Sequence, residues 1–290
     1  MKLQRTVNMA NYEIREFQMR ALEVLRVIDK VCREHGLRYY IADGTLLGAV
    51  RHKGFIPWDD DADITMPRPD LDIFIAHAKE WLPEPYELNC FEVNGKSTTV
   101  FPKVMDSSTT LIERMWFNQL GGVYVDIFPL EGHSNSKVVR QLHVWAYYFM
   151  KDFVRNKNRD PYKRGKGASS WWPKIVQKVF TNEGLQRFIQ RIQKYHDYDS
   201  ATLVGEFEDK TIGVMTKDVF GEPTPIMFEG YELMGPAKPH EYLTKIFGDY
   251  MTLPPENKRR IHGFDYVDLN TPYREYNDTR EFRKKMMNEK

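Results

Sequence analysis

The spacing of hydrophobic residues near the start of the chain predicts an amphipathic helix. Between residues 11 and 35, apolar side chains recur every three to four positions: Ile14, Phe17, Ala21, Leu25, Ile28 and Val31. Gly36 follows, at the position where a left-handed residue commonly ends a helix. We expect the apolar face of this helix to pack against a sheet.

Strand and helix patterns alternate over the next hundred residues. Strand formers dominate residues 37–42, and residues 46–50 have the pattern of the first turns of a helix. A second strand is predicted at 61–66, followed by a helix over 70–81. Further strands are predicted at 99–105, 109–113 and 122–128. This order predicts an α/β (α+β) fold, with a mixed sheet and flanking helices.

The character of the sequence changes twice and divides the chain into three parts. Residues 1–135 carry the alternating pattern, and we expect them to form the catalytic core. Residues 136–204 lack strand alternation and predict a helical elaboration. From 205 onward Gly and Pro return, with a helix predicted over 240–248. We expect residues 205–290 to return to the core and complete it.

The helical elaboration is strongly basic. Residues 137–196 hold 14 Lys and Arg against 3 Asp and Glu, a net charge of +11, whereas the rest of the chain sums to −10. Together with its Trp, Tyr and Phe residues, this charge suits anionic lipid headgroups or a polyanionic glycan. A helical bundle with inward-facing aromatics and solvated basic residues accounts for the pattern equally well. Nucleic acid is not expected as a partner, because no recognition motif accompanies the charge.

Cysteine content and hydropathy favour a cytoplasmic protein. Only Cys32 and Cys90 occur, too few for a disulfide framework or a cysteine-based zinc site. The first residues have no apolar stretch of signal-peptide length, and no run of roughly 18 apolar residues is present. We therefore expect a cytoplasmic location. A peripheral contact with the inner face of the cell membrane is compatible with it.

Four carboxylates stand within residues 59–63 and are the main candidates for chemistry. On a strand, Asp61 and Asp63 would project from the same face, and two adjacent carboxylates are stabilised by a hard divalent cation such as Mg²⁺. Asp60 would point away, while Asp59 would orient the loop or contact an arginine. A charged turn or a calcium-type loop would show the same spacing.

Asp126 interrupts an otherwise apolar or aromatic strand over residues 123–128. Burying a lone carboxylate is costly, so this side chain should have a metal, a cation or a catalytic role. An aspartate that caps a turn at the end of a strand would look the same.

Gly44 and Thr45 precede the short predicted helix, where free N–H groups and the helix dipole favour phosphate oxygens. Arg51 and His52 follow at its other end and could neutralise phosphate charge. Both observations have simpler explanations. Gly-Thr often caps a helix, and basic residues at a helix C-terminus complement the dipole.

Two stretches of sequence closely resemble the LicD family of phosphotransferases: ADGTLLGAVRH at 42–52 and GFIPWDDDADI at 54–64. Residues 121–130 resemble the strand of that family that carries a third acidic residue. Tyr242-Leu243, residues 247–251 and residues 253–255 resemble its C-terminal motif, although Phe247-Gly248 stands where Tyr-Gly is common. Residues 136–204 match no motif.

The resemblance implies a nucleotidyltransferase-like fold and assigns roles to the candidate residues. Gly44 and Thr45 would form the phosphate turn, Asp61 and Asp63 would bind Mg²⁺ or Mn²⁺, and Asp126 would be the third carboxylate, as a metal ligand or as the base. The implied donor is CDP-choline or another CDP-alcohol. The implied acceptor is a sugar hydroxyl of a lipid-linked glycan, a teichoic acid precursor or a lipopolysaccharide, and CMP would be released.

Three other functions fit the same residues. The transferred group could be ribitol phosphate or glycerol phosphate instead of phosphocholine. A true nucleotidyltransferase would attack the α-phosphate and release pyrophosphate. A non-catalytic module on the same scaffold would bind glycan or choline without turnover.

Overall fold

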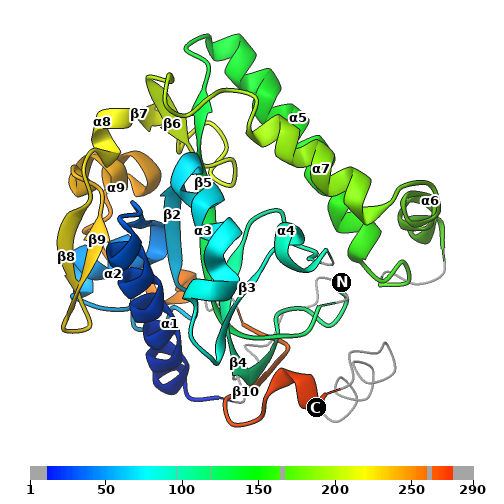
Figure 1. Ribbon diagram of the computed structural model, residues 1–290, viewed down its shortest axis with the longest axis horizontal. Coiled ribbons are helices and arrows are strands. Elements are labelled where there is room, and N and C mark those ends of the chain that lie inside the picture. Colours follow the sequence, from blue (N-terminus) through cyan, green and yellow to red (C-terminus); the bar gives the residue numbers. More distant parts are fainter. Residues whose placement is uncertain (1–11, 96, 118, 164–166, 260–262, 277–290) are drawn as a thin grey trace.

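A computed structural model of the protein describes residues 12–276, apart from 96, 118, 164–166 and 260–262. Its centre is a mixed sheet in which strand order does not follow the chain (Figure 1). The path of neighbouring strands is β1 (Tyr40–Ile41), β2 (Asp63–Pro67), β5 (Gly121–His133), β4 (Lys103–Ile112) and β10 (Tyr266–Asp268). Strands β2 and β5 are parallel, whereas the other pairs on this path are antiparallel. The predicted α/β fold with a mixed sheet is confirmed.

Helices α1 (Ile14–His35) and α3 (Arg68–Trp81) pack against this sheet. The buried face of α1 includes Phe17, Ala21, Leu25, Ile28 and Val31, so the predicted amphipathic pattern is confirmed. Gly36 ends the helix in the left-handed conformation, with φ of 67°. The short helix α2 (Asp43–His52) begins directly after β1, three residues earlier than the pattern predicted.

Strands β4 and β5 run side by side through the middle of the sheet. The two strands predicted at 99–105 and 109–113 form a single strand, β4, whose pairing with β5 is irregular between Asp106 and Leu111. A side chain at Gly122 of β5 would collide with the backbone carbonyl of Asp106, so only glycine fits there. Beyond the other edge of β4 lie β3 (Tyr86–Asn89) and the one-turn helix α4 (Phe91–Asn94).

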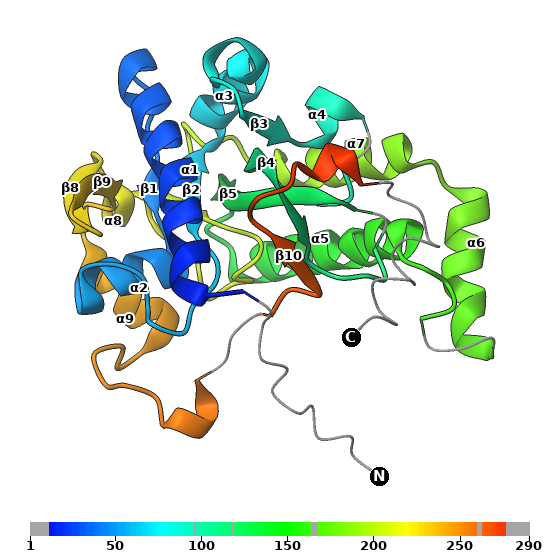
Figure 2. The same ribbon diagram turned by 90° about the horizontal axis from the view of Figure 1, so that it is seen from below.

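The basic segment is helical, as the sequence predicted. It contains α5 (Lys137–Asn158), a 3-10 turn (Ala168–Ser170), α6 (Trp171–Val179) and α7 (Asn182–Gln193). Helices α5 and α7 lie side by side, and α6 lies at the opposite end of the molecule from the hairpin of β8 (Thr224–Phe228) and β9 (Tyr231–Gly235) (Figures 1 and 2). These helices share a small hydrophobic cluster with Phe207 of the loop after β6 (Leu203–Gly205); its helical members are Val144, Tyr147, Val154, Val176, Leu185 and Ile189.

The last part of the chain returns to the sheet in several short elements. Strand β6 (Leu203–Gly205) pairs with the end of β5 and with β7 (Met215–Thr216). The remaining elements are α8 (Lys217–Phe220), the hairpin β8 (Thr224–Phe228) and β9 (Tyr231–Gly235), α9 (Pro239–Phe247), two 3-10 turns (Glu256–Lys258 and Tyr273–Glu275) and β10. The predicted helix over 240–248 corresponds to α9, but none of these strands was predicted, because each pairs with a partner that its own sequence does not reveal.

Helix α9 packs on α2, and β10 extends the sheet at β4. The division of the chain at residues 136 and 204 stays a prediction. Within the described residues, no helix is both long and apolar enough to span a membrane.

Candidate active site

A cavity of about 850 Å³ opens where β2 and β5 meet the N-terminus of α2. That volume lies in the usual range for a small-molecule site. Its lining includes the carboxylates Asp43, Asp59, Asp61, Asp63, Glu113, Asp126, Glu208 and Asp209. The basic side chains in the lining are Lys103, Arg114, Lys151 and Arg155. Helix α5 of the basic segment supplies two of these cations, so the helical elaboration contributes directly to the cavity.

Strand register places three charged residues level with one another. Asp126 of β5 is paired with Asp63 of β2 on one side and with Lys103 of β4 on the other. All three are at least nine-tenths buried. The ammonium nitrogen of Lys103 lies 2.9 Å from Oδ1 of Asp126, 3.4 Å from Oε2 of Glu113 and 3.5 Å from the centre of the Tyr124 ring. Lys103 therefore holds Asp126 in place and balances its charge.

Burial and mutual repulsion shift the acidity of this group. Burial raises the pKa of Asp126 to about 6, against the opposing effect of the Lys103 ammonium. Burial raises the pKa of Asp63 well above its usual range, and the negative charges of Asp61 and Asp126 raise it further. These carboxylates therefore favour a bound proton or a bound cation over the bare ionised state.

Asp61 lies two residues before β2 instead of within it, because the strand begins at Asp63 and not at residue 61 as predicted. The backbone N–H of Asp126 donates a 3.0 Å hydrogen bond to the carbonyl of Ala62, which fixes the chain between the two aspartates. Asp61 and Asp63 both line the cavity. The structure thus brings Asp61, Asp63 and Asp126 together, and we call these three residues the strand cluster.

The other two aspartates of the acidic run differ from each other. Asp60 is fully buried, and its Oδ2 accepts hydrogen bonds from the Tyr12 hydroxyl (2.8 Å) and the Gly263 N–H (3.0 Å). It does not line the cavity. Asp59 lines the cavity, and its carboxylate lies so close to Gly44 that a Cβ there would be 2.8 Å from Oδ2.

The predicted phosphate turn, Gly44 and Thr45, lies inside the first turn of α2. Gly44 lines the cavity, but Thr45 is buried beside it, and its hydroxyl accepts a 2.8 Å hydrogen bond from the N–H of Asp63. The hydroxyl thus positions the first residue of β2. The predicted phosphate contact of Gly44 and Thr45 stays a prediction.

Arg51 and His52 lie at the far end of α2, and neither lines the cavity. Arg51 donates from Nε to Nε2 of His52 (2.9 Å) and from Nη1 to the carbonyl of Tyr250 (2.7 Å). Burial and the neighbouring guanidinium lower the pKa of His52. Their predicted contact with substrate phosphate is not tested by this arrangement.

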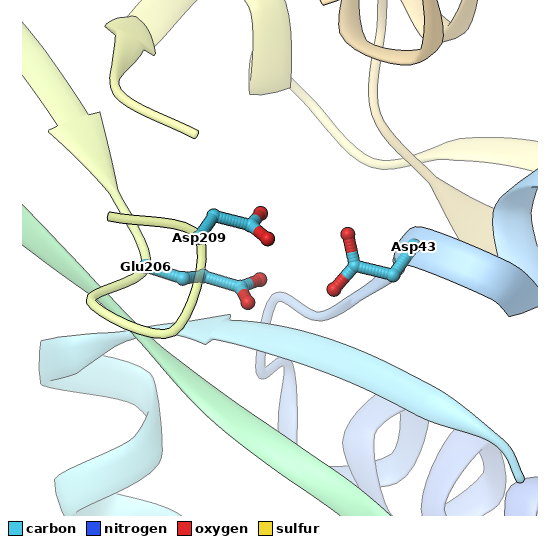
Figure 3. Close-up of side chains that lie close together, drawn as sticks. All are labelled: Asp43, Glu206 and Asp209. Atoms are coloured by element: carbon cyan, nitrogen blue, oxygen red, sulfur yellow. The ribbon is translucent and has the colours of Figure 1, made fainter. Parts of the chain in front are cut away.

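A second group of carboxylates was missed by sequence reasoning. Asp43, Glu206 and Asp209 each place one oxygen within 4.8 Å of the others (Figure 3). Asp43 starts α2, whereas Glu206 and Asp209 lie in the loop between β6 and β7. Burial is the main reason that the pKa of Asp43 rises to about 6 and that of Asp209 to about 7. We call these three residues the loop cluster.

Asp43 was visible as part of the first motif, and 206–209 is a short acidic run, but no sequence signal joins the two. Lys103 and Tyr242 were also missed as supporting residues. The Tyr242 hydroxyl donates a 2.9 Å hydrogen bond to Oδ1 of Asp43.

The sequence of this chain matches that of known proteins. Residues 36–164 match the nucleotidyltransferase domain that defines the LicD, FKTN and FKRP proteins, and this stretch contains Asp43 and the whole strand cluster. Residues 36–164 of the chain therefore carry a domain of the LicD family of phosphotransferases.

Individual relatives agree with the family match. The lipopolysaccharide cholinephosphotransferase LicD of Haemophilus influenzae is 28% identical over 268 residues, which cover 88% of this chain and 97% of that protein. The ribitol 5-phosphate transferase FKRP of human and of mouse is 47% identical over 47 residues, 16% of this chain and 10% of each relative. The LicD family resemblance seen in the sequence is therefore confirmed, together with its fukutin-type relation.

The strand cluster fits a hard divalent cation. Its donors are carboxylate oxygens, the ligands that Mg²⁺ prefers, and its members raise one another's pKa by charge repulsion. Such a cation binds through one or two carboxylates and keeps other positions for water and substrate phosphate.

Proposed function

We propose that this LicD-family protein transfers phosphocholine from CDP-choline to a sugar hydroxyl of a surface glycan precursor, such as a lipopolysaccharide or teichoic acid, and releases CMP. The observation that carries the proposal is the convergence of Asp61, Asp63 and Asp126 in a cavity of small-molecule size. The match to the cholinephosphotransferase of Haemophilus influenzae along most of both chains supports the choice of phosphocholine.

Asp61 and Asp63, with Asp126, are the residues that would hold Mg²⁺ or Mn²⁺. When bound, the cation would supply positive charge to the diphosphate of the donor and so favour loss of CMP. The requirement for a metal and the identity of the donor are parts of the proposal.

The side chains around the strand cluster position and neutralise the reacting groups. Lys103 fixes the Asp126 carboxylate at 2.9 Å. With its pKa raised to about 6, Asp126 can accept a proton near neutral pH or remain a metal ligand. As the base, Asp126 would take the proton of the sugar hydroxyl while the new O–P bond forms and the P–O bond to CMP breaks.

Cations and aromatic rings in the lining suit the two ends of the donor. Arg114 and Arg155 line the cavity with exposed guanidinium groups that can meet phosphate oxygens. A trimethylammonium group forms no ordinary hydrogen bonds and is held by aromatic faces. The rings that line the cavity are Phe101, Phe117, Tyr124, Phe128, Phe247 and Phe264.

The acceptor side of the proposal includes contact with an anionic membrane. The rings of Phe149 of α5, Trp172 of α6 and Phe180 surround the ring of Phe153, with centres 5.1 to 5.3 Å from it, and we call these four residues the aromatic patch. Phe149 is 65% exposed and Trp172 is 44% exposed. Exposed rings on a segment with net charge +11 suit the headgroup region of a membrane that carries a lipid-linked acceptor. This contact would place a cytoplasmic protein at the inner face of the membrane.

Ribitol phosphate is the second candidate for the transferred group, because the chain shares 47% identity with FKRP over 47 residues. The deciding experiment incubates the protein with CDP-choline, CDP-ribitol or CDP-glycerol, a glycan acceptor and Mg²⁺. We expect CMP release and an acceptor mass increase of one phosphocholine. Release of pyrophosphate from a nucleoside triphosphate would indicate a nucleotidyltransferase instead, and binding without turnover would indicate a non-catalytic module. CMP release that needs neither Mg²⁺ nor Asp61 would contradict the proposed roles.

A further inference from the structure

We propose that the loop cluster, Asp43, Glu206 and Asp209, binds a second divalent cation beside the strand cluster. The binding site is inferred from the loop cluster itself. A catalytic role for this cation, in contrast, rests on the proposed function.

The size of the loop cluster matches a small ion. One carboxylate oxygen from each residue lies within 4.8 Å of the other two. Oxygens bound to one cation lie at most two metal–oxygen bonds apart, about 4.2 Å for Mg²⁺ and about 5 Å for Ca²⁺. Figure 3 shows the three side chains converging on the space between them, Asp43 from α2 and the other two from the opposite side. Three carboxylates around a trimethylammonium group would stand farther apart, because its methyl groups keep the nitrogen away from oxygen.

Glu206 gives an independent indication of a ligand. Its side chain is 3% exposed, and neither carboxylate oxygen has a hydrogen-bond partner among the described residues. The nearby Thr65 hydroxyl donates its proton to the carbonyl of Phe128 instead, at 3.0 Å. A buried carboxylate without a partner is strongly unfavourable, so this side chain requires a cation or a proton.

The charges around Glu206 do not supply that cation. Burial is the main cause of its strongly raised pKa, and the negative charges of Asp43, Asp209 and Asp63 add to it. The two lysines of the cavity lining are engaged elsewhere: Lys103 pairs with Asp126, and Lys151 pairs with Glu208. The loop cluster thus concentrates negative charge, and none of its carboxylates forms an ion pair with a basic side chain in the described part of the chain.

The three carboxylates are held in place before any ligand binds. Asp43 has a positive φ of 44° at the start of α2, and the Tyr242 hydroxyl fixes its Oδ1 at 2.9 Å. The loop that carries Asp209 closes on itself through a 3.3 Å hydrogen bond from the N–H of Ile212 to the carbonyl of Asp209. Gly213 packs so closely against Asp209 that a side chain there would collide with it. Fixed ligands of this kind favour metal binding.

Both clusters face the same cavity, since Asp43 and Asp209 line it together with Asp61 and Asp63. Two cations there could meet the donor diphosphate from two sides, as in other phosphoryl-transfer sites with paired metals.

The test counts bound Mn²⁺ on the metal-free full-length protein by electron paramagnetic resonance of the free ion. We expect two ions per chain for the wild type, one for the double variant Asp61→Asn/Asp63→Asn, and one for Glu206→Gln/Asp209→Asn. The matched control Asp199→Asn removes an exposed carboxylate and should keep two. Two ions bound by the Glu206→Gln/Asp209→Asn variant, or one by the wild type, would overturn the inference.

Folding of the variants is checked by thermal unfolding in EDTA. We expect Glu206→Gln to unfold at a higher temperature than the wild type, because it removes a buried unpaired carboxylate. A lower temperature would show that Glu206 has a protein partner and would count against a cation site. In the Asp61→Asn/Asp63→Asn variant, displacement of the remaining Mn²⁺ by choline would assign the loop cluster to the organic cation and overturn the inference too.

The outcomes separate this inference from the proposed function. Two bound ions without turnover of any CDP-alcohol would support the second site and reject the transferase. Turnover that requires Asp63, with only the strand cluster binding Mn²⁺, would support the transferase and reject the second site.

Discussion

The strand cluster and the loop cluster share one cavity but balance their charge in different ways. In the strand cluster, Asp126 has the Lys103 ammonium at 2.9 Å, and both residues belong to neighbouring strands of the sheet. In the loop cluster, Asp43 accepts a hydrogen bond from the neutral Tyr242 hydroxyl, and Glu206 has no partner for either oxygen among the described residues. A cluster with an internal cation can fold without metal at lower cost than one that has none. Stability of the loop cluster should therefore depend more on a bound ion.

Removal of Lys103 should have the largest effect. Lys103→Met leaves Asp126 buried without its counter-ion, and breaking a buried ion pair from one side costs about 3 to 5 kcal/mol. The free energy of unfolding, measured in urea without metal near neutral pH, should fall by that amount, whereas Glu206→Gln in the loop cluster should raise it. An equal loss in both variants would remove the distinction between the clusters.

Asp63→Asn tests the strand cluster as the centre of the chemistry. Loss of one electrostatic stabiliser should lower kcat about 10² to 10³-fold, or roughly 3 to 4 kcal/mol in activation free energy. The same change should raise the unfolding temperature in EDTA, because it removes a buried charge that its neighbours repel. Activity is read as CMP release, with the exposed Asp199→Asn as control. Loss of activity together with loss of stability would point to a structural role instead.

The pH dependence of stability should report the titration of the loop cluster when the wild type is compared with a variant that lacks two of its carboxylates. The pKa of Asp43 is raised to about 6 and that of Asp209 to about 7, so the folded protein keeps protons that the unfolded chain releases near pH 4. Their contribution to stability is complete below about pH 4 and is lost as pH rises through about 6 to 7.

Thermal unfolding in EDTA checks this expectation. The wild type should lose several degrees relative to Glu206→Gln/Asp209→Asn as the pH is raised from about 5 to about 8. Mg²⁺ should raise the unfolding temperature of the wild type mainly at the higher pH, where the carboxylates are ionised. A constant difference across the pH range would argue against titration of the loop cluster.

Tyr242→Phe sharpens the comparison on a smaller scale. The variant removes the hydrogen bond to Asp43 Oδ1 but leaves every carboxylate in place, and a hydrogen bond to a charged group is worth about 1.5 to 3 kcal/mol. We expect weaker Mn²⁺ binding at the loop cluster with unchanged binding at the strand cluster. Phe220→Leu, which alters a ring that packs on Tyr242, serves as the packing control. Equal weakening at both sites would show that Tyr242 supports the whole cavity.

The smallest effect on chemistry is expected far from both clusters, in the aromatic patch. Phe149→Ser/Trp172→Ser should leave CMP release with a soluble acceptor unchanged, because neither side chain lines the cavity. Flotation with anionic liposomes at low salt should decrease relative to the wild type and to the control Ile73→Ser, which alters an exposed residue of α3. Unchanged flotation would remove the patch from the proposed membrane contact.

Features of the site could be predicted from the sequence where the cooperating residues lie close together in the chain, and were missed where they lie far apart. The sequence could place Asp61 and Asp63 together because their spacing is local, and it could single out Asp126 because a carboxylate interrupts an apolar strand; their metal-binding role stays a prediction. The role of Thr45 could not be recognised, since its hydroxyl accepts from the N–H of Asp63, a contact that depends on how α2 packs on β2. Arg51 was chosen for its charge alone, and the structure places it at the end of α2 away from the cavity.

By itself, the sequence determined the amphipathic helix, the strand and turn signals of the core, the helical basic segment and the acidic motif of the strand cluster. These depend on periodicity and on short spacings, which act within a few residues of the chain. Only the tertiary structure decided that β2 and β5 are neighbours, that Lys103 meets Asp126, and that a loop after β6 carries Glu206 and Asp209 to Asp43. Contacts between residues so distant in sequence arise from the packing of whole elements, and no local pattern encodes them.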